Sequence, residues 1–279
     1  MERNRTINFL YNSLPGRLIL KVLIRVNVSK FFGILMDRPA SKLFITWFIR
    51  NNNINMEEYN NSNYKSFNDF FTRDIKKGLR PFSRNENDLV SPCDGRLTAY
   101  PVKPDGTFHI KNSIYTIEDL LKDKSLADEF ADGVCLIFRL TPDDYHRYAN
   151  IDDGESVSSK KITGVLHSVR PLAVGKYKVY AQNAREYEVL QTKNFGKVIQ
   201  IEVGALFVGR IKNYSNGHTF KRGDEKGMFE FGGSTIVMLF QLNMISLDQA
   251  IYKNTRDNIE TIVRMGSKIG EKIDPEAEY

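Results

Sequence analysis

The sequence is poor in the residues that build metal centres and disulfide frameworks. Its 279 residues include four histidines and only two cysteines, Cys93 and Cys135, which lie far apart and form no CxxC pair. A structural zinc site needs four Cys or His ligands at characteristic spacings, and small secreted domains rely on many cysteines. We therefore expect a reduced protein that faces the cytosol and holds no metal.

Long apolar runs, repeats and low-complexity linkers are also missing. The most apolar stretch, residues 16–36, is interrupted by Arg17, Lys21, Arg25 and Lys30. A membrane-spanning helix needs about 20 predominantly apolar residues, and a secretory signal needs an uncharged apolar centre. The sequence therefore predicts neither a transmembrane nor a secreted protein.

Positive charge is concentrated at the N-terminus. Residues 1–50 contain nine Lys and Arg side chains but only two acidic ones, Glu2 and Asp37, whereas the formal charge of the whole chain is +6. The remainder of the chain is thus nearly neutral. We expect no nucleic-acid partner, because the basic surface belongs to one terminal segment.

This basic segment has the pattern of an interfacial helix. Arg17, Lys21 and Arg25 follow i, i+4, i+8 spacing in residues 16–36, and a second basic, aromatic run covers residues 42–50. Such helices lie in the headgroup layer of anionic membranes. The alternative is that they pack on the rest of the protein. The first interpretation predicts a membrane-associating segment, residues 1–60, bound peripherally at the cytoplasmic face of the cell membrane.

The remaining chain, residues 61–279, has the pattern of a strand-rich domain. Short β-branched runs bounded by Gly, Pro or Asp predict strands, and two short stretches predict helices. The predicted fold class is α+β, with a helical N-terminal segment before a strand-rich catalytic body. From about Leu247 the chain is polar, which fits either a helix or a frayed tail. The strands are expected at 134–138, 197–203, 205–209 and 234–240, and the helices at 117–121 and 125–130.

Three short motifs carry residue types suited to catalysis. They are S-P-C-D-G around Asp94, D-Y-H-R around His146, and G-G-S-T around Ser234. Histidine can act as acid or base near neutral pH, and glycine allows a strained peptide next to a nucleophile. Each motif alone is also typical of an ordinary turn or a structural histidine. The G-x-S-x-G elbow of α/β-hydrolases is absent.

Together, the order of these motifs resembles the phosphatidylserine decarboxylase family. The resemblance also includes F-x-D-F-F-x-R-x-x-K-x-G-x-R-P at Phe67–Pro81 and glycines near residues 204–209. It spans about residues 60–245. Four ordered motifs are far more specific than any one of them.

The resemblance implies a proenzyme that cleaves its own Gly233–Ser234 bond. The β chain would end at residue 233, the α chain would comprise residues 234–279, and Ser234 would become a covalent pyruvoyl group. The activity implied is conversion of phosphatidylserine to phosphatidylethanolamine and CO2 without an external cofactor. His146 would be the base and Asp94 the carboxylate that orients it.

One position departs from the family pattern. Many members have a second histidine three residues after the first, where this chain has Ala149. Either His146 serves both cleavage and protonation, or His167 substitutes as a secondary acid or base. His109 and His218 are expected at the surface.

Two other functions remain open at this stage. The chain could be a non-catalytic, strand-rich membrane-binding domain, or a Ser-His-Asp hydrolase that uses Asp94, His146 and Ser234. Only a self-cleaving enzyme yields two chains on a denaturing gel. Nothing in the sequence excludes a homo-oligomer.

Overall fold

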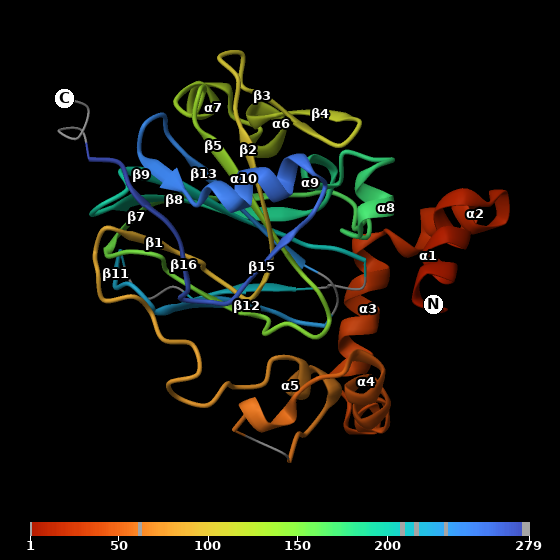
Figure 1. Cartoon of the computed structure of the whole chain (residues 1–279). Helices are drawn as coiled ribbons and strands as arrows, with labels where there is room; N and C mark the ends of the chain where they lie inside the picture. The colour runs from red at the N-terminus through yellow and green to blue at the C-terminus, as the bar shows by residue number, and fades with distance from the viewer. Residues whose placement is uncertain (1, 61–62, 207–209, 215–217, 232–233, 275–279) are drawn as a thin grey trace.

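An antiparallel sheet of eight strands forms the centre of the protein (Figure 1). The computed structural model describes residues 2–60, 63–206, 210–214, 218–231 and 234–274. The strand order is β11-β7-β8-β9-β13-β5-β2-β15. The strands are β11 (Thr219–Phe220), β7 (Gly154–Ile162), β8 (Arg185–Thr192), β9 (Lys197–Val203), β13 (Ser234–Phe240), β5 (Val134–Leu140), β2 (Gly95–Pro101) and β15 (Thr261–Val263).

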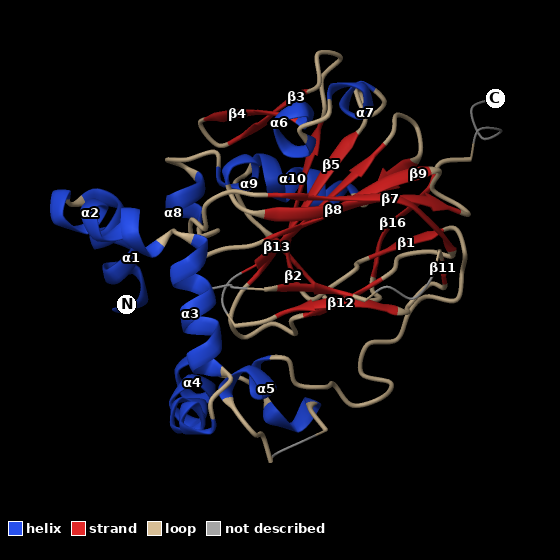
Figure 2. Cartoon of the chain, turned by 180° about the vertical axis from the view of Figure 1, so that it is seen from behind, coloured by secondary structure: helices blue, strands red, loops and turns tan. Residues whose placement is uncertain are grey.

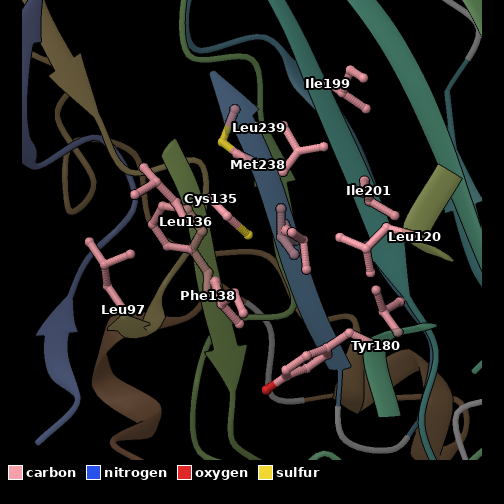
Figure 3. Close-up of a cluster of buried hydrophobic side chains, with 14 of the residues drawn as sticks. Leu97, Leu120, Cys135, Leu136, Phe138, Tyr180, Ile199, Ile201, Met238 and Leu239 are labelled. Carbon is pink, nitrogen blue, oxygen red and sulfur yellow. The ribbon is translucent and has the colours of Figure 1, made fainter. Parts of the chain in front are cut away.

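The central strand β13 is buried along its whole length. It pairs with β5 on one side and β9 on the other, in a register that places Thr235 between Arg139 and Val203. Because both sheet faces are covered, its sequence is a continuous β-branched and apolar run. Figure 3 shows Met238 and Leu239 packed among side chains of the neighbouring strands.

Helices and the β3–β4 hairpin lie on one face of the sheet, and smaller sheets that include β12 lie on the other. Figures 1 and 2 show α6, α7, α9 and α10 on one side and β12 on the opposite side. The helices are α6 (Ile117–Leu121), α7 (Lys124–Asp128), α8 (Pro171–Val174), α9 (Val179–Gln182) and α10 (Gln249–Arg256). The smaller sheets are β10 (Ile211–Asn213) with β12 (Glu225–Phe229) and β6 (Arg147–Ala149), β1 (Asp88–Val90) with β16 (Lys268–Lys272) and β14 (Ile245–Leu247), and β3 (Thr107–Ile110) with β4 (Ser113–Thr116).

The N-terminal segment forms several short helices along one side of the sheet (Figure 2). The single helix predicted over residues 16–36 is wrong, because the chain turns at Ile24 and Arg25. The Ile24 carbonyl accepts a hydrogen bond from the Leu166 N–H at 2.9 Å, and Arg25 is extended. The helices are α1 (Glu2–Asn12), α2 (Leu14–Leu23), α3 (Val26–Met36), α4 (Ile45–Asn52) and α5 (Phe67–Phe71), with 3-10 turns η1 (Pro39–Phe44) and η2 (Met56–Glu58).

The α+β class is confirmed, as are the strands predicted at 134–138, 197–203 and 234–240 and the helix at 117–121. Ala205 and Leu206 do not form the predicted strand, and residues 207–209 lie outside the described ranges. Of the two alternatives for the chain after Leu247, the helix is confirmed by α10. It is followed by β15 and β16, which were not predicted and pair with β2 and with β1 and β14. The boundary at residue 60 stays a prediction.

Candidate active site

The three predicted motifs meet at one edge of the central sheet. β2 begins at Gly95, β5 ends at Leu140 and β13 begins at Ser234, and these three strands are neighbours. Ser234 is the direct register partner of Leu140. A side chain at Gly95 would place its Cβ 3.1 Å from the Arg139 carbonyl oxygen, so this close approach favours glycine.

Ser234 is fully buried at the start of β13. Its hydroxyl has no hydrogen-bond partner among the residues that the structure describes. A buried hydroxyl without a partner is costly, and this one lies directly at the predicted cleavage bond. Gly233, on the other side of the predicted cleavage bond, lies outside the described residues.

His146 is buried and held in one tautomer. Its Nδ1 lies 2.9 Å from the Asp144 carbonyl oxygen, which only accepts, so Nδ1 carries the proton. Its Nε2 is buried without a partner in the described part of the chain. Burial, helped by the nearby Arg73 guanidinium, lowers the pKa of His146 to about 3. The imidazole is therefore neutral at physiological pH and has one free lone pair.

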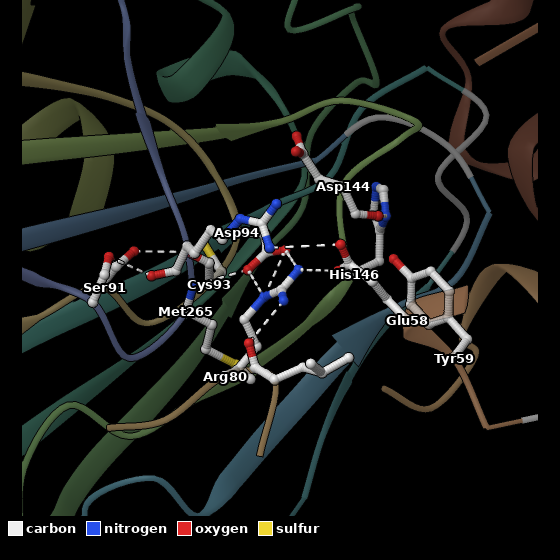
Figure 4. A network of polar contacts seen from close by, with 12 residues as sticks. Glu58, Tyr59, Arg80, Ser91, Cys93, Asp94, Asp144, His146 and Met265 are labelled. Carbon is white, nitrogen blue, oxygen red and sulfur yellow. Dashed lines mark hydrogen bonds and ion pairs between the residues drawn. The ribbon is translucent and has the colours of Figure 1, made fainter. Parts of the chain in front are cut away.

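Asp94 lies at the same edge but is bound to other groups. Arg80 Nε donates to Asp94 Oδ1 at 2.8 Å, Arg80 Nη2 donates to Oδ2 at 2.6 Å, and the Met265 N–H donates to Oδ1 at 2.8 Å. Arg80 also contacts Glu58 at 2.9 Å (Figure 4). The orienting role predicted for Asp94 is taken in this structure by the carbonyl of Asp144.

A cavity of about 380 Å³ borders the strands on both sides of Ser234. Leu140 contributes from β5, and Ala205 contributes from the chain just after β9. A second cavity of about 430 Å³ shares Ile7, Arg170 and Pro171 with it and opens beside α1. Polar or charged residues that line the inner cavity include Arg96, Arg139, Thr141, Asp143 and Ser168.

Comparison with known proteins places these motifs in a family. The family model for phosphatidylserine decarboxylase matches residues 67–271. The chain belongs to the phosphatidylserine decarboxylase family. A phosphatidylserine decarboxylase proenzyme 2 from Clostridium acetobutylicum is 50% identical over 273 residues, covering 98% of this chain and 94% of that protein. A phosphatidylserine decarboxylase proenzyme from Fusobacterium nucleatum is 40% identical over 270 residues, covering 95% and 90%.

His167, the substitute considered for the family's second histidine, lies in a separate aromatic pocket. Its ring stacks on Tyr177 at 4.4 Å, and its Nδ1 lies 3.2 Å from the Tyr11 hydroxyl. Burial lowers the pKa of His167 to about 4. The Asn183 side chain donates to the carbonyls of His167 and Gly204, at 2.8 and 2.7 Å. His167 is thus tied to the end of β9, beside Ser234. His109 and His218 are exposed, as predicted.

Two arginines around the site were not predicted from the sequence. Arg80 and Arg73 belong to the family element at Phe67–Pro81, but the sequence gives no sign of which groups they bind. Arg73 is buried, its guanidinium lies 4.3 Å from the Tyr59 ring centroid, and its Nη2 donates to the Asp144 carbonyl at 3.4 Å. Its contact with the partner of His146 explains its effect on the pKa of that histidine.

Proposed function

We propose that this protein is a self-cleaving decarboxylase that converts phosphatidylserine into phosphatidylethanolamine and CO2. Its relatives are named phosphatidylserine decarboxylase proenzymes. The observation that carries the proposal is the buried, unpartnered Ser234 hydroxyl at the start of β13, paired with the end of β5, from which the chain runs to the neutral His146. A Ser-His-Asp hydrolase is disfavoured because Asp94 is bound by Arg80 and the Met265 N–H, while His146 Nδ1 faces the Asp144 carbonyl instead.

In the proposed self-cleavage, His146 Nε2 takes the Ser234 hydroxyl proton and Oγ attacks the Gly233 carbonyl carbon. The C–N bond breaks, the Ser234 nitrogen receives the proton, and an ester joins the two chains. Removal of the Ser234 α-proton expels the Gly233 carboxylate and leaves a dehydroalanine end. Water then replaces the nitrogen, which leaves as ammonia, and a keto group remains at position 234.

The residues around Ser234 fit such a pyruvoyl group. Ser234 is fully buried, and β13 is hydrogen-bonded between β5 and β9, pairing that would keep the two chains together after cleavage. When formed, the pyruvoyl ketone supplies an acceptor for the substrate amine and for the electron pair left by CO2. The protein positions this group, excludes water and keeps a neutral histidine nearby for proton transfer.

The two cavities, which share Ile7, Arg170 and Pro171 in their walls, provide the proposed path for the lipid. The inner cavity is lined by Leu140, the register partner of Ser234, and by the hydroxyls of Thr141 and Ser168, which suit a polar headgroup. Its Arg96 and Arg139 are paired with Asp144 and Glu260. The outer cavity lies against α1 and opens toward the N-terminal helices. We place the headgroup in the inner cavity and the acyl chains on the side of α1.

The N-terminal helices expose the surface proposed to meet the membrane. No helix in the described ranges is long and apolar enough to cross a bilayer. Apolar side chains nevertheless face outward on α2, which carries the exposed Arg17 and Lys21, and on η1 and α4 at the far end of α3 (Figure 1). We propose peripheral attachment at an anionic membrane surface, on the cytoplasmic face of the cell membrane. The apolar residues include Leu14 (73% exposed), Leu18 (66%), Leu43 (84%) and Trp47 (63%).

Reversing Arg17, Lys21 and Arg25 to Glu is expected to weaken binding to vesicles that contain phosphatidylserine. Each basic residue contributes about 1 kcal/mol near an anionic surface, and salt screens this attraction. Vesicle sedimentation at low and high salt measures the effect, and turnover of a short-chain soluble substrate serves as the control. Binding that ignores the reversal at every salt concentration and lipid composition would contradict the proposal.

Intact mass tests the proposed function itself. The purified protein should contain a large chain ending at Gly233 and a small chain of residues 234–279. The small chain should be lighter than a serine-started peptide by one ammonia and should resist Edman degradation. A free serine at position 234 in fully active enzyme would reject the pyruvoyl assignment.

A further inference from the structure

Helix α5 lies between the candidate base and the chain that leads to Ser234. This helix is the aromatic part of the family element at Phe67–Pro81, to which the mechanism above gives no role. The Phe71 ring centroid is 4.2 Å from that of the His146 imidazole and 5.7 Å from that of the Phe231 ring. One side chain of α5 therefore packs against both the base and the residue three positions before the nucleophile.

Asn68, also on α5, fixes the backbone at Phe231. Its side chain is buried, and its Oδ1 accepts a hydrogen bond from the Phe231 N–H at 3.1 Å. Its Nδ2 donates to Asp37 Oδ1 at 2.7 Å and to the Gly33 carbonyl at 3.3 Å. A single amide thus connects α3 to the backbone of Phe231.

A second set of contacts reaches the preceding residue, Glu230. Asp37 accepts a hydrogen bond from Arg210 Nη2 at 2.7 Å, and Arg210 Nη1 lies 3.2 Å from Glu230 Oε2. The Glu230 N–H donates to the Arg210 carbonyl at 3.1 Å. The Phe231 ring packs edge-on against Phe67, with centroids 4.9 Å apart. Two consecutive residues are therefore anchored through their backbone and their side chains.

The pairing of β6 with β12 joins this anchor to the base. The Phe229 N–H donates to the His146 carbonyl at 2.9 Å, only two residues before Phe231. Phe231 is also the last described residue before the predicted cleavage bond. Only Gly232 and Gly233 separate it from Ser234, and glycine restricts the backbone very little. β13 holds the chain after the predicted cleavage bond, so the position of Phe231 limits where the scissile carbonyl can lie.

We propose that Asn68 is a positioning residue for self-cleavage, which anchors Phe231 and so fixes the chain just before the scissile peptide relative to His146. This inference rests on the self-cleavage proposed above. Near-attack geometry is demanding, and a displacement of about 1 Å can slow a reaction about 100-fold. After cleavage the same anchor holds the new end of the large chain, but decarboxylation no longer depends on it.

The test compares two rates in Asn68→Ala. The first-order conversion of one chain into two, followed on denaturing gels, should slow about 10- to 100-fold. Once cleavage is complete, turnover of a short-chain soluble phosphatidylserine should lie within about 2-fold of the unmodified enzyme. The double variant Asn68→Asp/Asp37→Asn exchanges the two side chains. The carboxylate at position 68 can still accept from the Phe231 N–H, and the amide at position 37 can donate to it. This variant should therefore restore most of the cleavage rate.

Asn52→Ala is the matched control for stability. Asn52 is another buried asparagine of the N-terminal helices, and its Nδ2 donates to the Phe48 carbonyl at 2.7 Å. If Asn52→Ala, with an equal loss of thermal stability, slowed cleavage as much as Asn68→Ala, the role would be structural and the proposal overturned. An unchanged cleavage rate in Asn68→Ala would overturn it as well.

Hydrogen exchange at the Phe231 amide tests the anchor independently of self-cleavage. In the Ser234→Ala background the chain stays whole, and adding Asn68→Ala should accelerate hydrogen exchange at the Phe231 amide. Unchanged protection there would reject the anchor, whatever the cleavage assay shows. Failure of the unmodified protein to cleave would instead reject the proposed function, while the exchange result still decides whether Asn68 holds Phe231.

Discussion

Ser234→Ala should leave one uncleaved chain of about 32.1 kDa without measurable decarboxylation. The substitution removes both the attacking hydroxyl and the atoms from which the keto group would form. The decrease in activity should be at least about 10³-fold, the scale seen when a serine nucleophile is lost. A denaturing gel and a CO2-release assay on the same preparation measure both effects.

The same substitution should not destabilise the fold. The Ser234 hydroxyl is buried without a partner in the described residues, so removing it should raise the free energy of unfolding by roughly 1 kcal/mol. Ser29, in α3, is also fully buried with an unpaired hydroxyl, which makes Ser29→Ala a matched control. It should show the same change in stability but normal cleavage. Two chains from Ser234→Ala would contradict the proposed nucleophile.

The central strands could be predicted because local sequence and burial agree. β13 and β9 are apolar, β-branched runs whose neighbours cover both faces. The break at Ile24 could not be predicted, because it depends on a hydrogen bond to Leu166, far away in the sequence. The same holds for β15 and β16, which are three and five residues long and exist because they pair with strands near residues 88–97.

The candidate site likewise has parts that could be predicted from the sequence and parts that could not. Its motifs identified Asp94, His146 and Ser234, and the sheet register brings those three segments to one edge. Their partners come from distant parts of the chain. Asp94 is held by Met265, 171 residues away, and Phe231 by Asn68, 163 residues away. Such contacts have no local pattern, so the only sequence signal was the family element that contains Asn68 and Arg80.

His146→Gln should slow self-cleavage by about 10²- to 10⁴-fold, the usual contribution of a general base. Glutamine retains a donor for the Asp144 carbonyl but cannot take the Ser234 proton. His167→Gln distinguishes the two buried histidines, and His109→Gln is the control for an exposed one. Normal cleavage in the His146 variant together with failure in the His167 variant would transfer the role to His167.

The pH dependence of cleavage gives an independent test of the same assignment. The pKa of His146 is lowered to about 3, so its neutral form predominates throughout the range from pH 7 to pH 5. The cleavage rate of folded protein should therefore stay nearly constant over that range. A histidine with the ordinary pKa of about 6.5 would lose most of its basic form there.

The free energy of unfolding should change between pH 7 and pH 5 even though the cleavage rate does not. His146 and His167 both have lowered pKa values in the folded protein, about 3 and about 4. Below about pH 6.5 the unfolded chain binds protons that the folded chain does not, so the free energy of unfolding falls by about 1.4 kcal/mol per pH unit for each histidine. Cleavage rates must therefore be compared at pH values where denaturation curves show folded protein. A rate that falls with an apparent pKa near 6.5 while the protein stays folded would show that the base is a solvated group, and the buried imidazole of His146 would then serve packing alone.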